Sequence, residues 1–469
     1  MPWTLKNMKT ISSILPVLAL GWAFSTSAGA AEIERIGNGS NPKAKVGPDG
    51  TIHVVASSGG AVLYYRYDGS AWSGGPVAGT DQVSASKMNQ PALGIAPDGS
   101  LHVVYGPRSN MPMVDGHQVD GDPTRGVWYT TNTGAGWSAP TNIIDLYTEY
   151  LSIEADGAGL LRLVALVVVE PAYLVSERTW YGGAAEFRRE GTTWSSPASL
   201  ENAERKYAML VRDAAGSLHL AVRWKWVHYA VDSGGGWHNL PDTGDTFDDI
   251  LLPEGRSLSP NPYSMSAPHI LVTADGTVHA VAAAWSSDSS WVQARYAFND
   301  GTGWSEETAG EKDGELVMDG EINLCSVAVE PGGLVHVFCG QLPGSLVHAS
   351  GRPGSWSAKE VLDTAMADTV DAPAFDSFFH DGKIHVVYEG SDGVYHLTMD
   401  PEPPPADETL EPVPEIPEDA ATEDAPDLPA ETTDPVDTVD TAGEPDAAID
   451  TDGGDTGSQD VGGGCACAI

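Results

Sequence analysis

Basic residues are scarce in this chain of 469 residues, with 24 Lys and Arg against 66 Asp and Glu and a formal net charge of −42. Binding to nucleic-acid phosphates or to anionic lipid surfaces requires clustered Lys and Arg, so the deficit excludes both classes of partner. Apolar residues still make up 41% of the sequence, which is enough for a large hydrophobic core. We therefore expect a folded protein that does not bind nucleic acid.

The last 69 residues contain no Lys, Arg or aromatic residue, and they hold 20 of the acidic residues and 11 of the 33 prolines. Such a segment buries too little apolar surface to offset the entropy of ordering it, and proline and self-repulsion keep it extended. Residues 401–464 are therefore predicted to form a disordered acidic stalk. Residues 465–469 form a separate end that contains two cysteines.

Long apolar runs are also lacking: the N-terminal run Ile11–Phe24 is short for a transmembrane helix and is broken by Pro16. Two lysines precede it, and Ala28-Gly29-Ala30 follows, which is the order of a signal peptide and its cleavage site. We predict that residues 1–30 are removed on export to the cell surface, the medium or the periplasm. The mature chain, from Ala31, then has no transmembrane segment; a retained anchor is the alternative.

Only four cysteines are present, and Cys325 and Cys339 lie in two apolar runs around a Pro-Gly-Gly turn. In a hairpin centred near Gly332 these positions are directly opposite, where Cβ atoms lie about 4.5–5.5 Å apart. An oxidising compartment favours a cross-strand disulfide between them, and two buried thiols are the alternative. Neither Cys has a second Cys or His at ligand spacing, which argues against zinc.

A repeat of a turn followed by an apolar strand organises the middle of the chain. "PDGTIHVV" from Pro48 and "PDGSLHVVY" from Pro97 are two of its copies, and successive copies are 49 to 60 residues apart. Each Asp-Gly or Gly-Gly predicts a tight turn, and each alternating run predicts a strand. Six copies carry a histidine at the same place and a degenerate seventh carries arginine, in the order His53, His102, Arg162, His219, His279, His336 and His385. We interpret these histidines as structural hydrogen-bonding residues.

A second element, a strand and a Gly-rich turn that ends in Trp, follows the first in six units. Four strands per unit of about 50 residues, seven times over, predict a single seven-bladed β-propeller, an all-β fold, over residues 31–400. The seventh unit lacks a last strand, and Glu32–Gly37 precedes the first unit as an orphan strand. We predict that this N-terminal strand closes the last blade beside Val394–Met399, which removes open sheet edges. The repeated tryptophans are interpreted as structural: Trp72, Trp137, Trp194, Trp237, Trp304 and Trp356.

The Trp turn resembles the bacterial-neuraminidase or Asp-box repeat of sialidase-like propellers, whose pattern is Ser-x-Asp-x-Gly-x-Thr-Trp. Asp68–Trp72 and Asp300–Trp304 keep its Asp, Gly and Trp with one spacer residue fewer. The resemblance covers about 365 residues and implies propeller blades. That family's catalytic set is three arginines, a Tyr with a Glu partner, and an Asp acid. The early arginine motif is missing here, so no catalytic residue is carried over.

The long connections of blades two to five are the places where function is expected, because loops on a rigid scaffold carry binding residues. Aromatic faces there suit the stacking of a sugar ring, and an arginine suits a carboxylate; packing between blades is the alternative role of the aromatics. The candidate ligand-binding residues are Arg108, Arg178, Trp180, Tyr181, Trp224, Trp226, Trp285 and Trp291.

Acidic groups in the same connections form weaker candidates. Four oxygen or nitrogen ligands within eight residues have the density that Ca²⁺ requires, and a solvated acidic loop is the alternative. These four are Asp115, His117, Asp120 and Asp122, and a second acidic group is Asp242, Asp245, Asp248 and Asp249. A glycosidase needs paired carboxylates, for which Glu170, Glu177, Asp245 and Asp288 are the candidates.

The C-terminal end, "DVGGGCACAI", is similar to the sorting tails of surface proteins in myxobacteria and their relatives, but it stops without their apolar span and basic end. We favour surface attachment through this end, with free secretion as the alternative. A redox pair of Cys465 and Cys467 and an intermolecular disulfide are the other interpretations of the two cysteines. We expect a monomeric, exported recognition module for glycans or for extracellular or envelope proteins. The alternatives are a glycoside hydrolase or polysaccharide lyase on the same face, and a structural envelope component.

Overall fold

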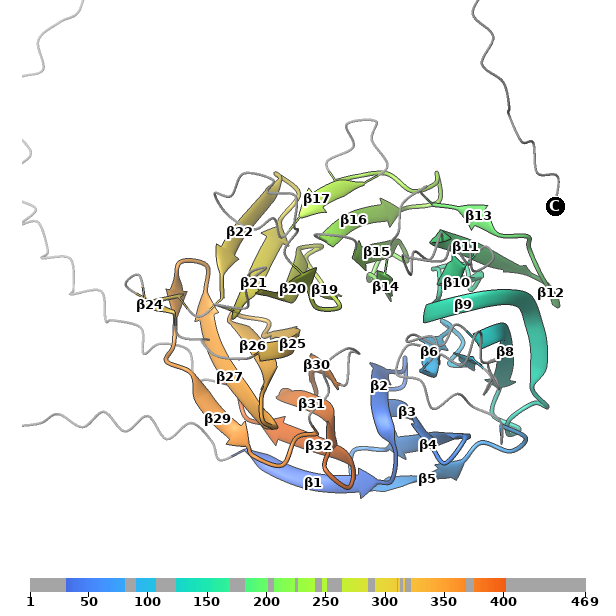
Figure 1. Cartoon of the computed structure of the whole chain (residues 1–469), viewed down its shortest axis with the longest axis horizontal. Coiled ribbons are helices and arrows are strands. Elements are labelled where there is room, and N and C mark those ends of the chain that lie inside the picture. Colours follow the sequence, from blue (N-terminus) through green and yellow to red (C-terminus); the bar gives the residue numbers. More distant parts are fainter. Residues whose placement is uncertain are drawn as a thin grey trace, which may run out of the picture. The chain divides into compact units, whose positions relative to one another are not determined.

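The strands of the chain form a closed ring in the computed structural model shown in Figure 1. The structure describes residues 31–80, 90–106, 124–168, 182–200, 206–223, 227–240, 247–250, 264–285, 292–309, 311–312, 315–316, 322–367 and 375–401. Within these ranges no residues form a helix that is long and apolar enough to cross a membrane. Beyond Pro401, the predicted stalk and the two C-terminal cysteines lie outside the described residues.

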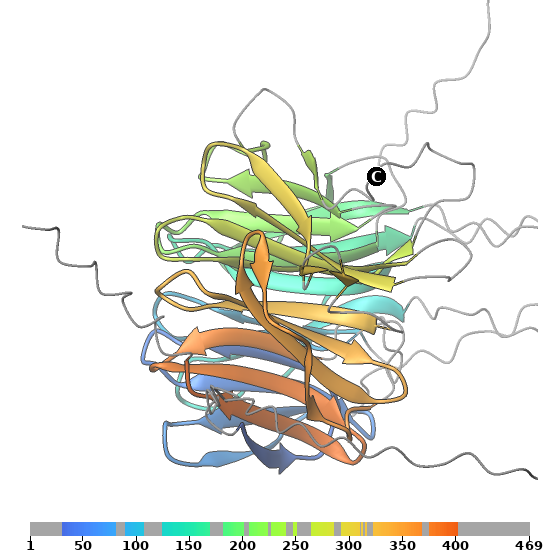
Figure 2. The same cartoon turned by 90° about the vertical axis from the view of Figure 1, so that its left-hand side faces the viewer.

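Seven antiparallel blades surround a central axis, as the repeat predicts, and Figure 2 shows their strands running between the two faces of the ring. In each blade the first strand lies nearest the axis and the last lies at the rim. Blade one contains β2 (Ser40–Val46), β3 (Ile52–Ser58), β4 (Ala61–Tyr67) and β5 (Trp72–Pro76). Blade two contains β6 (Ala92–Ile95), β7 (Leu101–Tyr105), β8 (Thr124–Asn132) and the first part of β9 (Thr141–Ala155). Blade three contains the rest of β9, β10 (Leu161–Val168), β11 (Gly182–Glu190), β12 (Thr193–Trp194) and β13 (Ala198–Ser199).

The other four blades continue the ring in chain order. Blade four contains β14 (Lys206–Arg212), β15 (Leu218–Arg223), β16 (Val227–Asp232) and β17 (Asp248–Ile250). Blade five contains β18 (Ser264–Met265), β19 (His269–Val272), β20 (Val278–Trp285), β21 (Val292–Asn299) and β22 (Trp304–Thr308). The hairpin of β23 (Glu311–Lys312) and β24 (Glu315–Leu316) then precedes blade six, which contains β25 (Ile322–Val329), β26 (Val335–Gln341), β27 (Ser345–Arg352), β28 (Ser355–Trp356) and β29 (Glu360–Asp363). Blade seven contains β30 (Phe375–His380), β31 (Lys383–Gly390) and β32 (Gly393–Met399).

The N-terminal strand β1 (Glu32–Gly37) closes the ring as the rim strand of blade seven. It pairs antiparallel with β32, and its register places Glu34 opposite His396. The Glu34 carboxylate accepts hydrogen bonds from His396 Nδ1 at 3.0 Å and from the Trp72 indole of blade one at 2.7 Å. The prediction of a closing N-terminal strand is confirmed, and the strand also ties the last blade to the first.

One strand departs from the expected pattern of four separate strands per blade. β9 serves both as the rim strand of blade two and as the innermost strand of blade three, because it pairs with β8 and with β10. Its sequence, "TNIIDLYTEYLSIEA", contains no Gly or Pro that would end a strand. Figure 1 shows this strand curving from the rim to the hub.

The repeated histidines occupy one position in the second strand of their blades and are buried. In blades one, two, four and five the ring Nδ1 is hydrogen-bonded to a tyrosine hydroxyl of the third strand, at 2.5–2.7 Å. In blades six and seven the partner is another histidine, His348 or His396, at 3.0 and 2.9 Å. The interpretation of these histidines as structural hydrogen-bonding groups is confirmed.

The repeated tryptophans join neighbouring blades. Five of the six pack edge to face on the third-strand tyrosine, or on His396 at the same place in blade seven, of the preceding blade, an arrangement that stabilises aromatic pairs. The ring centroids are 5.2 Å apart for Tyr64 and Trp137, 5.7 Å for Tyr129 and Trp194, 4.9 Å for Tyr229 and Trp304, 5.6 Å for Tyr296 and Trp356, and 5.1 Å for His396 and Trp72. The prediction that these tryptophans are structural is therefore confirmed.

The joint between blades three and four is ionic, because Arg162 replaces the histidine. Its guanidinium lies 5.9 Å from the centroid of the Trp237 ring and donates hydrogen bonds to Glu186 at 2.9 Å and to Asp232 at 2.6 Å. All three charged residues are less than 5% exposed. Buried charges of this kind are stable only when paired. Asp232 therefore depends on Arg162, whereas Glu186 also accepts hydrogen bonds from Arg188 at 3.0 and 3.2 Å.

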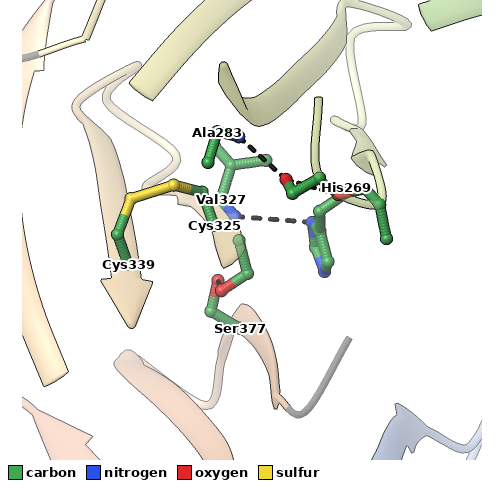
Figure 3. The surroundings of a disulfide bond; sticks show 9 residues. His269, Ala283, Cys325, Val327, Cys339 and Ser377 are labelled. Carbon is green, nitrogen blue, oxygen red and sulfur yellow. Dashed lines mark hydrogen bonds between the residues drawn. A yellow bond between two sulfur atoms is a disulfide. The ribbon is translucent and has the colours of Figure 1, made fainter. Parts of the chain in front are cut away.

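Cys325 and Cys339 form the predicted disulfide between β25 and β26, with Cα atoms 4.1 Å apart. They are directly opposite in register, at the short separation typical of a non-hydrogen-bonded antiparallel pair. Figure 3 shows the bond beside the innermost strands of blades five to seven. A disulfide of this kind indicates an oxidising, extracytoplasmic location.

Removing Arg162 should destabilise the ring strongly. We expect Arg162→Met to lower the free energy of unfolding by about 3–5 kcal/mol, because Glu186 and Asp232 lose their buried counter-ion. Urea unfolding at pH 7.5 measures the change. Arg352→Gln is the control, since Arg352 is exposed and its guanidinium donates a hydrogen bond to the Gly332 carbonyl at 2.8 Å. A loss below about 1 kcal/mol for Arg162→Met would contradict the ionic joint.

Stability should fall when the pH falls below about 6.5. Burial lowers the pKa of His53, His102, His279 and His385 to about 4, so the unfolded chain takes up protons that the folded chain does not. As the pH falls from its unfolded to its folded pKa, each such histidine lowers the free energy of unfolding by roughly 1.4 kcal/mol per pH unit. Urea unfolding at pH 7.5, 6.0 and 5.0 measures this slope. The variant His279→Gln should show a shallower slope, and a flat wild-type profile would refute the explanation.

Candidate functional site

Two faces of the ring differ in their connections. On one face, here called the turn face, lie the repeated Asp-Gly and Trp turns. On the other, the connection face, the second strand of each blade leads to the third, and each blade leads to the next. The second strands end there at Ser58, Tyr105, Val168, Arg223, Trp285, Gln341 and Gly390.

The connection face is asymmetric. In blades one, six and seven the second and third strands are joined by only two or three residues, for example between Ser58 and Ala61. In blade two the connection runs from Tyr105 to Thr124, and in blade three from Val168 to Gly182. The long second-to-third connections therefore belong to blades two, three and five, as the sequence indicates.

The strand β9 brings the two longest of these connections together. Thr148 of β9 pairs on one side with Thr124, where β8 begins, and on the other with Val167, near the end of β10. Neighbouring strands lie about 4.8 Å apart, so the ends of both connections are only about 10 Å from each other. Residues 107–123 and 169–181 therefore start from the two sides of one strand.

A cavity of about 360 Å³ occupies the central channel and is lined by residues of the innermost strand of every blade. This volume lies within the range of small-ligand sites in proteins. Its apolar wall includes Tyr150, Tyr207, Leu324 and Phe375. The channel is thus a hollow with aromatic walls at the hub of the ring.

The charged groups of the channel are largely paired. Lys43 Nζ of blade one and His269 Nε2 of blade five each lie 3.7 Å from Oδ1 of Asp376 in blade seven. The other oxygen of Asp376 accepts a hydrogen bond from the Ala44 amide at 2.7 Å. Burial, with the nearby Lys43 charge, lowers the pKa of His269 to about 4, so this ring is neutral at pH 7. Lys45 pairs with Glu154 in the same channel.

Figure 3 shows how His269 is held beside the disulfide strand. Its Nδ1 accepts a hydrogen bond of 3.4 Å from the Val327 amide of β25. On the same strand, the Ser326 hydroxyl bonds the Ser377 hydroxyl of blade seven at 2.8 Å. These contacts cross from blade to blade, so they fix the innermost strands around the cavity.

Two tyrosines that the sequence reading missed lie at the connection-face end of the cavity. Tyr150 in β9 and Tyr207 in β14 have φ angles of +54° and +59°, and each lies at a register shift of its strand pair. Their ring centroids are 4.1 Å apart, and the Arg223 guanidinium lies 5.0 Å from the centroid of the Tyr207 ring. A bulky residue with positive φ is strained, and such residues concentrate at functional sites.

Most sequence-predicted ligand residues lie outside the described residues. Trp285 is the last residue of β20, which places it at the connection face, although its side chain is outside the description. The remaining candidates outside the described residues are Arg108, Arg178, Trp180, Tyr181, Trp224, Trp226 and Trp291, together with Asp115, His117, Asp120 and Asp122. The connections that contain them all begin and end at the connection face. Glu170, Glu177, Asp242, Asp245 and Asp288 are also outside the described residues.

Two of the acidic candidates are described and have structural partners. Asp248 accepts hydrogen bonds from the Leu240 amide at 2.8 Å and from the Trp304 indole at 2.9 Å. Asp249 lies 2.5 Å from Nδ1 of His228. Across the described part of the chain, no three His, Cys, Asp or Glu residues are grouped so as to hold a metal ion.

Neither a family model nor a curated protein matches this sequence. Among solved structures, an ulvan lyase of polysaccharide lyase family PL25 is 13% identical over 77% of this chain and 94% of its own, with a TM-score of 0.48. An intramolecular trans-sialidase from Ruminococcus gnavus is 13% identical over 80% and 99%, with a TM-score of 0.37. A protein of unknown function from Dyadobacter fermentans is 12% identical over 68% and 97%, with a TM-score of 0.43. This distant likeness concerns the propeller fold.

Proposed function

We propose that this protein is an exported recognition module that binds glycans through the connection face over blades two to five. The observation that carries the proposal is the pairing of Thr148 with the ends of two long connections. That pairing brings the described ends of both connections, Thr124 and Val167, onto the strand that carries Tyr150. Sugar rings present apolar faces that stack on aromatic side chains, and such stacking needs several aromatics in one place.

The tryptophans of the turn face have structural partners, which supports the assignment of binding to the connection face. These tryptophans are used between blades, and three of their indoles donate to a carboxylate of the preceding blade's rim strand: Trp72 to Glu34, Trp304 to Asp248 and Trp356 to Glu307. Aromatic side chains with such partners are structural. We therefore assign glycan binding to the aromatic residues in the connections of the connection face.

A glycan-array screen of the full chain, with Ca²⁺ and with EDTA, tests the proposal. We expect saturable binding that weakens about 5- to 30-fold in Trp285→Ala, because one stacking contact contributes about 1–2 kcal/mol. Trp194→Ala is the matched control, since Trp194 packs on Tyr129 at the turn face. A loss of binding in EDTA would assign Ca²⁺ to the acidic connections.

The outcomes separate the competing functions. If no glycan on the array binds, glycan binding is refuted, and an extracellular or envelope protein is left as the partner. Shortening of a bound polysaccharide during incubation would instead assign a glycoside hydrolase or polysaccharide lyase to this face. Binding that is equal in Trp285→Ala and wild type would move the site away from blade five.

Export to the cell surface or the medium is the second part of the proposal, and the disulfide supports it. N-terminal sequencing of the protein recovered outside the cytoplasm should begin at Ala31. That start keeps the whole of β1, which begins at Glu32, in the ring. A mature start beyond Gly37 would remove the closing strand and contradict the proposed processing site.

A further inference from the structure

Three polar side chains converge in the hub cavity without bonding one another. Lys43 in β2, His269 in β19 and Asp376 in β30 all line this cavity. Oδ1 of Asp376 lies 3.7 Å from Nζ of Lys43 and 3.7 Å from Nε2 of His269. Hydrogen bonds between nitrogen and oxygen are normally about 2.7–3.2 Å long, so neither pair forms one. Two donors and one acceptor therefore face each other across a distance that a direct hydrogen bond does not span.

Contacts on the other side of these groups hold them in this orientation. Oδ2 of Asp376 accepts a hydrogen bond from the Ala44 amide at 2.7 Å. Nδ1 of His269 accepts a hydrogen bond from the Val327 amide, shown in Figure 3, so the proton of the neutral imidazole is on Nε2. In the described part of the chain, no hydrogen bond reaches Nε2 of His269, Nζ of Lys43 or Oδ1 of Asp376. His269 and Asp376 are each only 6% exposed, and buried polar atoms are normally hydrogen-bonded, so these atoms have the chemistry of a binding site.

Two donors and a carboxylate acceptor suit a hydroxyl group, which both accepts and donates hydrogen bonds. A hydroxyl oxygen bound between them would lie about 2.8 Å from a nitrogen and from the carboxylate. The three groups carry no net charge at pH 7, because His269 is neutral and Lys43 balances Asp376. Two further cations of the described lining, Lys45 and Arg212, already bond a carboxylate and two backbone carbonyls, respectively. A charged ligand would leave an uncompensated charge in this buried place, which is costly, so the ligand is neutral.

The rest of the cavity suits the apolar face of a sugar ring. Tyr150, Tyr207 and Phe375 line it, and its volume of about 360 Å³ is that of a site for a small ligand. His269 is the first residue of β19 and Asp376 the second of β30, so both lie near the connection-face ends of their strands. The side chain of Lys43 is 23% exposed, so solvent reaches this group from the channel.

We infer that Lys43, His269 and Asp376 bind the hydroxyl groups of one neutral sugar residue in the hub cavity. A free sugar and the end of a glycan chain that enters from the connection face share this chemistry. The inference goes beyond the proposed function, because none of the three residues belongs to the long connections of blades two to five.

Calorimetry of the full chain with glucose, galactose, mannose, glucuronate and alanine tests the inference. We expect saturable binding of at least one neutral hexose. Glucuronate should bind roughly tenfold more weakly or worse, because its carboxylate competes with Asp376 for Lys43. Alanine, a zwitterion without a hydroxyl group, should not bind. A tetrasaccharide of the bound hexose distinguishes the two sources: binding tighter than that of the free hexose assigns the site to a chain end, and weaker binding assigns it to the free sugar.

Variants locate the contact. Lys43→Met should weaken hexose binding by about 10- to 100-fold, the usual effect of losing a charged hydrogen bond. Lys383→Met is the matched control and should change nothing, because Lys383 forms a similar ion pair, 3.8 Å from Asp400, on blade seven away from the cavity. His269→Gln keeps a donor near the position of Nε2 and should retain more binding than His269→Leu. Thermal unfolding confirms that each variant is folded; if these variants do not fold, the preference of the wild type for the hexose over glucuronate decides.

Three results would overturn the inference. One is the absence of binding by every neutral hexose, and another is hexose binding that is unchanged in folded Lys43→Met. The third is binding of alanine in place of a sugar. The array screen of Trp285→Ala tests the connection face separately, so a failure at the hub and a failure of the proposed function are distinguishable.

Discussion

Closure of the ring depends on the pairing of β1 with β32, strands that are more than 350 residues apart in the sequence. Without it the rim of blade seven would be an open sheet edge, and blade one would lose the carboxylate that binds Trp72. Glu34 serves both needs, since it accepts hydrogen bonds from His396 within its blade and from the indole of the next. One carboxylate therefore links the two ends of the propeller. Non-local pairing of this kind imposes a large loop-closure entropy, which only the completed set of blades offsets.

Four joints between blades share one arrangement, in which the third-strand tyrosine of one blade packs against the tryptophan of the next. The tyrosine hydroxyl satisfies a buried histidine, and its ring packs on the indole, so one side chain serves both the interior of its blade and the joint. Arg162 replaces this with an ion pair network at the joint of blades three and four. Since Tyr150 and Tyr207 lie on the innermost strands of those two blades, the exceptional joint and the strained tyrosines occur in the same sector of the ring.

The candidate site lies in this sector of the ring. Because β9 runs without interruption from blade two into blade three, no separate connection lies between them, and the long connections of both blades start from its two sides. The hub contributes a cavity with paired charges, and blade four contributes a guanidinium stacked on a tyrosine. A rigid scaffold of this kind positions connections that differ from blade to blade, which is how propellers of one architecture acquire different ligands.

Sequence alone determined the features that repeat or that lie close together in the chain. The spacing of the histidines and tryptophans predicts seven blades, the unpaired Glu32–Gly37 strand predicts closure, and the Pro-Gly-Gly hairpin predicts the Cys325–Cys339 bond, because turns and alternating runs are encoded locally. Tertiary structure alone decided which aromatic of one blade meets the tryptophan of the next, and that β9 belongs to two blades. It also decided that Tyr150, Tyr207 and Arg223 meet at the hub. Those contacts join residues that share no periodic pattern, and only the packing of whole blades around one axis brings them together.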